Sequence, residues 1–305
     1  MGYRRTLRRE AACTGIGLHS GRPVRLRLRP APAEHGIRFR RSDVGVEIPA
    51  TLQYLGGQDH ATTLTHEGVS IGTIEHLLAA LGALGVDDVL VEVDGPEVPV
   101  LDGSAAPFVI LLHEAGLRPL AVPRLYIKVL EPVEVVRGGK SVRILPADHF
   151  EVTYTIGFDH PLLRHQALAL RVTSRSFTEA IASARTFGFL REVEMLRQGG
   201  LALGGSLENA VVIGETGVLN NKLRFADEFV RHKILDAVGD LTLLAHPLLG
   251  RVEAKKAGHA LHAALAQKLL ATPAAWELVP RPGIPALEKG ASPAAREPDL
   301  RPAEA

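Results

Sequence analysis

Two kinds of hydrophobic periodicity alternate along the 305-residue chain, and each half runs through them in the same order, strands first and helices second. Residues 24–28 alternate apolar and charged side chains, which is the period of a half-buried strand. Between Thr73 and Leu84 apolar residues recur every three or four positions, and Gly85 follows them as a helix terminator. The repeated order predicts an α+β fold made of two layered units of related plan.

The remaining patterns continue this order through both halves. In the first half a strand is expected at residues 89–93, an apolar segment follows at 98–101, and the turn residues 102–104 precede a helix at 105–115. In the second half we expect three strands, a helix, a further strand and two more helices, in that order, at residues 125–136, 141–145, 151–158, 177–184, 210–213, 226–245 and 259–270.

The boundary between the two halves is expected at residues 116–123. This segment carries a glycine and two prolines and has no clear periodicity. The expected units are an N-terminal α+β domain at residues 1–120 and a C-terminal α+β domain at residues 124–276. Residues 280–305 are rich in proline, alanine and charge, which is typical of a disordered tail.

Charge and cysteine content exclude several classes of protein. Lys plus Arg (35) nearly balance Asp plus Glu (34), so the net charge of +1 creates no general field for binding nucleic acid or a membrane surface. No stretch reaches the roughly 18 to 20 apolar residues of a membrane helix, and no apolar run follows the basic N-terminus as in a signal peptide. The single Cys13 excludes an internal disulfide and a multi-cysteine metal site. We therefore expect a cytoplasmic protein.

One candidate metal-binding pair lies in the segment FVRHKILDAVGDL. His232 and Asp236 are four residues apart, so on a helix they project from one face and could share a metal ion, and Asp240 follows one turn later. Apolar residues occupy much of the remaining circumference, so this polar stripe is expected to be partly buried. Taken alone, the three residues could equally form a solvated face of an amphipathic helix.

A second candidate lies in the segment TIEHLLAALGALG. His76 is preceded by Glu75 and sits among leucines on the helix expected there. Taken alone, such a pair is more often a hydrogen-bonded core histidine beside a surface charge. The zinc motif H-E-x-x-H does not occur, because the pairs at 66–67 and 113–114 both lack the second histidine, and this excludes a zincin.

Several further segments occur together with these two in a characteristic order. The set comprises GIGLHSG at 15–21, LRPAPAEHGIRFRR at 28–41, TIEHLLAALGALGVDD at 73–88, EVPVLDGSAAPF at 97–108, SARTFGF at 183–189, FVRHKILDAVGDL at 229–241 and KAGHALHAAL at 256–265. In this set and order the chain resembles the UDP-3-O-acyl-N-acetylglucosamine deacetylases, the zinc amidases of lipid A biosynthesis. The resemblance extends from the N-terminus to about Trp276.

The resemblance implies a two-domain β-α-α-β sandwich, in which the helices of both domains pack between the two sheets. It also implies an active site at the domain junction. His76 from the first domain and His232 and Asp236 from the second would bind one Zn2+ ion there. Three such ligands leave a fourth tetrahedral position for water, as in catalytic zinc sites. Iron(II) (Fe2+) could bind the same ligands.

The resemblance further implies roles for five residues around the metal. Glu75 would be the general base, and His259 the general acid that protonates the departing amine. Asp240 would orient His259 and favour its charged form. Thr186 matches a hydroxyl that stabilises the oxyanion beside zinc, and Lys233 matches a lysine that meets the polar part of the substrate.

Substrate contacts are also implied, although less specifically. Phe187 and residues 188–207 match the region that forms an apolar passage for the substrate's acyl chain, but these apolar side chains could equally be core. Glu192 aligns with an acidic residue that contributes to sugar binding, and His19 lies in a motif near the site. A lysine that some members use toward the nucleotide is missing around Leu145, so diphosphate recognition is expected to differ here.

The expected reaction is hydrolysis of the N-acetyl group of UDP-3-O-acyl-N-acetylglucosamine, giving UDP-3-O-acyl-glucosamine and acetate, the committed step of lipid A biosynthesis. The expected form is a monomer without a nucleic-acid partner. Two alternatives remain open at this point. One is a zinc amidase of the same fold with another N-acylated substrate, and the other is a non-catalytic metal-binding or scaffold protein with a degenerate site.

Overall fold

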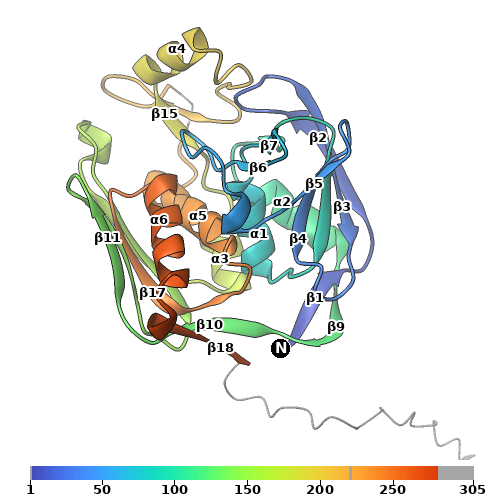
Figure 1. The fold of residues 1–305 in the computed structure, drawn as a ribbon. Coiled ribbons are helices and arrows are strands. Elements are labelled where there is room, and N and C mark those ends of the chain that lie inside the picture. Colours follow the sequence, from blue (N-terminus) through green and yellow to red (C-terminus); the bar gives the residue numbers. More distant parts are fainter. Residues whose placement is uncertain (1, 220–221, 281–305) are drawn as a thin grey trace, which may run out of the picture.

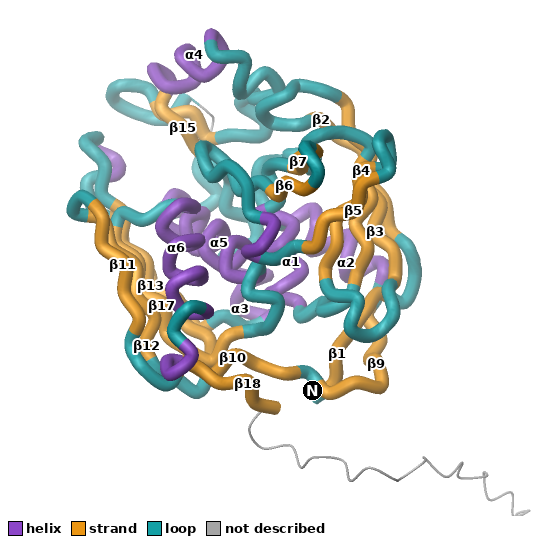
Figure 2. The backbone as a smooth tube through the Cα atoms, viewed as in Figure 1, coloured by secondary structure: helices purple, strands orange, loops and turns teal. Residues whose placement is uncertain are grey.

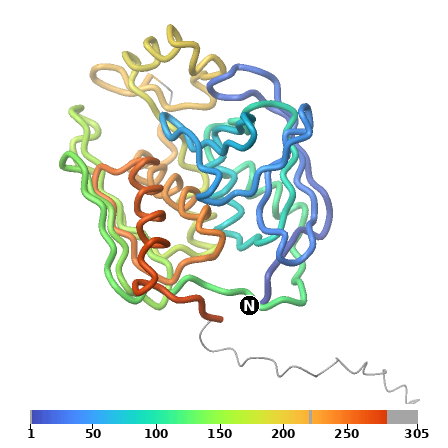
Figure 3. Tube along the Cα trace, in the orientation of Figure 1, coloured from blue at the N-terminus to red at the C-terminus, as the bar shows by residue number. Residues whose placement is uncertain are grey.

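The computed structural model of the chain describes residues 2–219 and 222–280 (Figure 1). The N-terminal half of the chain lies on one side of the molecule and the C-terminal half on the other, as the colours of Figure 3 show. The tail expected at residues 280–305 lies outside the described residues, apart from Pro280, which ends a strand.

The N-terminal half forms a five-stranded sheet in which one face is buried. Its strand β3 (Pro23–Pro30) confirms the predicted alternation, because the buried Val24, Leu26 and Leu28 alternate with the exposed Arg25 and Arg27. All neighbouring strands are antiparallel except β4 and β8. The strand order is β2 (Ala11–Ile16), β3, β8 (Val89–Val93), β4 (Ile37–Arg41) and β5 (Val46–Pro49).

The C-terminal half forms a seven-stranded mixed sheet around β17 (Leu248–Lys255). The single strand expected at 125–136 is two strands, with Pro132 between them where it donates no ladder hydrogen bond. The main path is β11 (Val133–Arg137), β12 (Lys140–Leu145), β17, β10 (Leu125–Val129) and β18 (Trp276–Pro280), while β13 (Phe150–Ile156) pairs with β17 and with β14 (Gln166–Arg171).

Five helices lie between the two sheets, as Figure 2 shows, which confirms the expected α+β sandwich. Within the described residues none of them combines the length and apolarity needed to cross a membrane. The helix predicted at 177–184 is instead at 174–180, because Thr173 forms a capping box with Ser176. The layer contains α1 (Glu75–Leu84), α2 (Ala106–Ala115), α3 (Ser174–Ala180), α5 (Glu228–Thr242) and α6 (His259–Leu270).

The segment expected to be an aperiodic boundary forms a strand. Residues 117–123 are β9 (Leu117–Pro123), which pairs antiparallel with β1 (Tyr3–Leu7), the first strand of the chain. Its backbone hydrogen bonds are therefore supplied by a segment more than a hundred residues away, which no local pattern reveals. The division into domains of 1–120 and 124–276 remains a prediction.

Shorter elements complete the fold. The helix α4 (Leu190–Gln198) projects from the body at the top of Figure 1. The others are β6 (Leu64–His66), β7 (Val69–Ile71), β15 (Phe187–Phe189), β16 (Val211–Ile213) and the 3-10 helices at Leu52–Tyr54, Pro161–Leu163 and Pro273–Ala275.

Helices α1 and α5 approach each other backbone to backbone. A Cβ atom added at Gly239 of α5 would overlap the carbonyl oxygen of Glu75 and lie 2.8 Å from its carbonyl carbon. Farther along the pair, two turns after Glu75 on α1 and one turn after Gly239 on α5, Gly82 lies against the side chain of Thr242. The two helices can therefore be this close only because each presents a glycine to the other.

We predict that Gly239→Ala destabilises the protein. Alanine is the better helix former by about 1 kcal/mol, but the clash is with backbone, which cannot rotate away. Overpacking of this kind costs about 1–3 kcal/mol, so we expect a net loss of about 1–2 kcal/mol in the free energy of unfolding, measured by urea denaturation. The matched control is Gly57→Ala, where the added Cβ meets nothing within 4 Å among the described residues. An unchanged or higher stability of Gly239→Ala would contradict the account of the helix contact.

Candidate functional site

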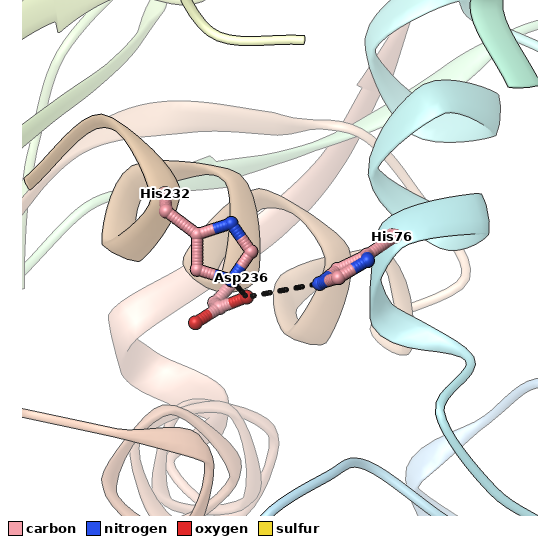
Figure 4. Close-up of side chains that lie close together, drawn as sticks. All are labelled: His76, His232 and Asp236. Atoms are coloured by element: carbon pink, nitrogen blue, oxygen red, sulfur yellow. Dashed lines mark ion pairs between the residues drawn. The ribbon is translucent and has the colours of Figure 1, made fainter. Parts of the chain in front are cut away.

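Three side chains from α1 and α5 converge on one point (Figure 4). His76 is the second residue of α1, and His232 and Asp236 lie one turn apart on α5. The Oδ1 atom of Asp236 is 3.3 Å from Nε2 of His232 and 3.8 Å from Nε2 of His76. His76 is more than 150 positions from the other two in the sequence, and the close approach of the two helices brings them together.

The hydrogen bonds around these side chains leave the converging atoms free for a metal ion. Nδ1 of His232 is 3.1 Å from the carbonyl oxygen of Ala184, so Nδ1 carries the hydrogen and Nε2 presents its lone pair. Oδ2 of Asp236 accepts from Lys233 at 2.9 Å, whereas the buried Oδ1 has no hydrogen-bond partner among the described residues. A buried carboxylate oxygen without a donor is costly unless a cation binds it.

Burial and neighbouring charges hold the three groups in their metal-binding forms. Burial, with a further contribution from His232, lowers the pKa of His76 to about 3. Burial likewise lowers the pKa of His232. For Asp236 burial acts in the opposite direction, but His232 and Lys233 outweigh it and hold the pKa well below its usual range. Neutral imidazoles and an ionised carboxylate are the forms that bind metals.

Two groups in the described part of the chain bring three ligand atoms within 4.8 Å of one another. One is His76, His232 and Asp236, and the other is Asp240, His259 and His262. In the second group both imidazoles already hydrogen-bond to the carboxylate, so its members satisfy one another. The unpartnered oxygen of Asp236 therefore makes the first group the candidate metal centre.

Glu75 lies at the start of α1, directly before His76, and is buried. Its Oε2 atom accepts a hydrogen bond of 3.0 Å from the backbone N–H of Thr62. Burial raises the pKa of Glu75 to about 7; the charge of His259 opposes this, and those of Asp236 and Asp240 reinforce it. A carboxyl group with such a pKa can both accept and release a proton near neutral pH.

His259 begins α6 and is held by Asp240 of α5. Its Nδ1 atom is 2.8 Å from Oδ2 of Asp240, and because a carboxylate only accepts, Nδ1 carries a hydrogen. The hydroxyl of Thr62 donates to the other oxygen of Asp240 at 2.5 Å. Burial alone would lower the pKa of His259, but the Asp240 carboxylate outweighs it and raises the pKa to about 10. The imidazole is therefore charged at neutral pH.

Ten of the eleven expected site residues line one cavity of about 560 Å³, and the eleventh, Asp240, is hydrogen-bonded to His259. The metal ligands and Glu75 line it beside His259. Thr186 precedes β15, Phe187 begins that strand, and Lys233 lies on α5. The ammonium of Lys233 lies 5.4 Å from the ring centre of Phe187. Glu192 and His19 complete the set, and both ring nitrogens of His19 are buried without a hydrogen-bond partner among the described residues. The roles assigned to these residues remain predictions.

The apolar side chains of segment 188–207 divide into two sets. Leu190 and Leu196 of α4 line the cavity. Met195 and Leu203 are instead exposed, by 63% and 54%. None of the nine residues of α4, all of them described, is buried, so this helix is not part of the core. The region thus forms an apolar wall at the edge of the site.

Comparison with known proteins assigns the chain to a family. The model of the family described as "UDP-3-O-acyl N-acetylglycosamine deacetylase" matches residues 4–271. The chain belongs to this family. Curated relatives named UDP-3-O-acyl-N-acetylglucosamine deacetylase include proteins of Myxococcus xanthus, 50% identical over 90% of this chain and 89% of the relative, and Anaeromyxobacter dehalogenans, 49% identical over 90% of each. The protein of that name from Neisseria meningitidis is 46% identical over 90% of this chain and 92% of its own length.

In this member of the deacetylase family, three residues that sequence reasoning missed support the expected ones. Thr62 contacts both Glu75 and Asp240, partly through its backbone, which leaves no trace in the residue type. His262 also binds Asp240, and its position three residues after His259 on a helix could have indicated a shared face. Tyr154 contacts His262 from the sheet, a tertiary contact without a local signal.

We predict that Asp236→Asn weakens metal binding at least about 10-fold, because it removes the charge of a direct ligand and even supporting contacts are worth 10- to 100-fold. The measurement is metal content per chain after dialysis against a competing chelator. Asp227→Asn, at the N-cap of the same helix, is the matched control and should keep its metal. A fully loaded Asp236→Asn protein would show that the metal binds elsewhere.

Proposed function

We propose that the protein hydrolyses the N-acetyl group of UDP-3-O-acyl-N-acetylglucosamine to give UDP-3-O-acyl-glucosamine and acetate, the committed step of lipid A biosynthesis. The observation that carries this proposal is the unpartnered carboxylate oxygen of Asp236, which faces two imidazoles in a cavity that also holds Glu75 and His259. The names of the relatives supply the substrate. We further propose that the protein acts as a monomer, because the groups invoked all come from one chain. A cytoplasmic location is also proposed, since the single Cys13 fits a reducing compartment.

The proposed cofactor is one zinc ion bound by His76, His232 and Asp236. Bound there, zinc would polarise the amide carbonyl and lower the pKa of water toward 7. Two imidazoles and one carboxylate with a fourth position open are typical of catalytic zinc sites. Because the same ligands suit iron(II), the ligand types alone do not decide which metal is used in the cell.

In the proposed reaction, Glu75 and His259 move the protons. Glu75 takes a proton from the attacking water as the water oxygen bonds to the amide carbon. His259 gives its Nε2 proton to the nitrogen as the carbon–nitrogen bond breaks, because an unprotonated amine anion is a poor leaving group. Nδ1 remains hydrogen-bonded to Asp240 throughout, which keeps Nε2 toward the cavity. The products are then acetate and a free amine.

Thr186 and Lys233 are proposed to act on the polar part of the reacting substrate. The Thr186 hydroxyl would donate to the oxygen that becomes negative. Burial acts against the charge of Lys233, but Asp236 outweighs it and raises the lysine pKa, so the ammonium is charged at neutral pH. Such a cation beside the reacting carbon favours an anionic substrate.

The proposed substrate orientation follows from the two kinds of cavity wall. The acyl chain would lie along the apolar side formed by Phe187, Leu190 and Leu196. The sugar would lie toward Glu192, with His19 near the polar end.

The rival hypothesis, an amidase for another N-acylated substrate, predicts turnover of other amides but not of this one. Acetate release from UDP-3-O-acyl-N-acetylglucosamine separates the two, and its absence with folded, metal-loaded protein would contradict the proposal.

We predict that Glu75→Gln lowers kcat for acetate release about 10²- to 10⁴-fold, the usual contribution of a general base, without loss of bound metal. Glutamine keeps the shape of the side chain but cannot accept the proton. Glu194→Gln, on the exposed face of α4, is the matched control. A scaffold protein with a degenerate metal site would show no dependence on Glu75.

We predict a bell-shaped pH dependence of kcat/KM, because Glu75 must be ionised and His259 protonated. Asp240 raises the pKa of His259, so activity is lost as pH rises through that raised value. Asp240→Asn removes the charge, lowers the pKa of His259 and moves the basic limb to lower pH. The acidic limb should also move to lower pH, because the Asp240 charge helps to raise the pKa of Glu75. If the basic limb did not move in Asp240→Asn, His259 would not be the general acid.

A further inference from the structure

A buried hydrogen-bonded chain leads from the candidate acid into the C-terminal sheet. Oδ2 of Asp240 is 2.8 Å from Nδ1 of His259 and also 2.8 Å from Nδ1 of His262, one helical turn further along α6. Nε2 of His262 lies 3.1 Å from the phenol oxygen of Tyr154 on β13. His262 and Tyr154 are 1% and 0% exposed, so neither contacts bulk water.

The hydrogens of this chain are fixed by its chemistry. Asp240 is ionised, because His259 and the two hydrogen bonds from the histidines outweigh burial and hold its pKa below the usual range. A carboxylate only accepts, so Nδ1 of His262 carries a hydrogen. Burial, reinforced by Asp236 and Asp240, raises the pKa of Tyr154 well above its usual value, so the phenol keeps its hydrogen and can donate to Nε2 of His262. Both oxygens of Asp240, both ring nitrogens of His262 and the phenol of Tyr154 then have a partner.

Packing alone does not explain this arrangement. The rings of Tyr154 and His262 meet edge to face at 5.8 Å, a contact that two apolar side chains could also make. Burying a phenol and an imidazole instead is costly unless each is hydrogen-bonded, and their bonds lead to Asp240 rather than to water. The polar pair thus supplies a hydrogen bond to Asp240, which an apolar pair could not supply.

We propose that His262 and Tyr154 are positioning residues for the reaction: they hold the carboxylate of Asp240 in the orientation that fixes which nitrogen of His259 faces the substrate cavity. The inference rests on the proposed role of His259 as acid. Tyr154 fixes the tautomer of His262, His262 donates to Asp240, and Asp240 accepts from His259.

The same geometry determines how much of the Asp240 charge reaches His259. That carboxylate is shared among three donors, namely His259, His262 and the Thr62 hydroxyl. The other charged groups that act on His259 are Asp236 and Glu75, and neither is touched by a change at position 262. Removal of the His262 donor should therefore leave more charge for His259, which then holds its proton to higher pH.

The test compares His262→Leu, which cannot donate, with His262→Asn, whose amide can replace the lost N–H. Zinc-loaded protein labelled with ¹⁵N in histidine is titrated by NMR, and His259 is assigned by comparison with His259→Asn. We expect the His259 midpoint of His262→Leu to rise by about one pH unit, the worth of one hydrogen bond to a charged group. His262→Asn should show less than half of that rise. In turnover, kcat of His262→Leu should fall while KM is unchanged.

Tyr154→Phe tests the chain from its other end and does not depend on folding of the histidine variants. Without the phenol donor, the Nε2 resonance of His262 should move toward that of an imidazole nitrogen without a hydrogen bond. Equal midpoints in wild type and His262→Leu, or equal rises in both His262 variants, would overturn the inference. Absent turnover by wild-type protein would contradict the proposed function instead, since the NMR titration needs no substrate.

Discussion

The contact between the backbones of Gly239 and Glu75 is the constraint on which the site depends. It fixes the separation of α1 and α5, and the metal ligands are divided between these two helices. His76 follows Glu75 directly, and Asp236 lies one turn before Gly239, so the residues that bind and react stand at the point of closest approach. A side chain at position 239 would push them apart.

Burial of several ionisable groups around this contact is tolerated because they compensate one another. Asp236 faces Lys233 and two imidazoles, and Asp240 accepts from three donors. One oxygen of Asp236 is the exception in this cluster, since no donor of the described residues reaches it. The same low-polarity surroundings lower the pKa of His76 and raise that of Glu75, so one environment prepares both a ligand and a base.

Side-chain periodicity and helix-capping residues predicted the parts of the fold that depend on neighbouring residues alone. The alternation in β3, the glycine that ends α1 and the limits of α6 were correct because side-chain periodicity and capping act over a few residues. The pairing of β1 with β9 was missed because a distant segment decides it. The split of residues 125–136 was missed although Pro132, which separates the two strands, is a local signal. At the site, the helical spacing of His232 and Asp236 was informative, whereas Thr62 and Tyr154 contribute through a backbone N–H and a cross-layer contact that residue type does not reveal.

The most direct test of the account is the position of the metal itself. Anomalous diffraction at the zinc edge, from crystals of protein loaded with one equivalent of zinc, should give one peak between His76, His232 and Asp236. Ligand distances of about 2.0–2.2 Å are expected for such nitrogen and oxygen ligands. A peak among Asp240, His259 and His262 instead, the second group in the described residues that could hold a metal, would contradict the account.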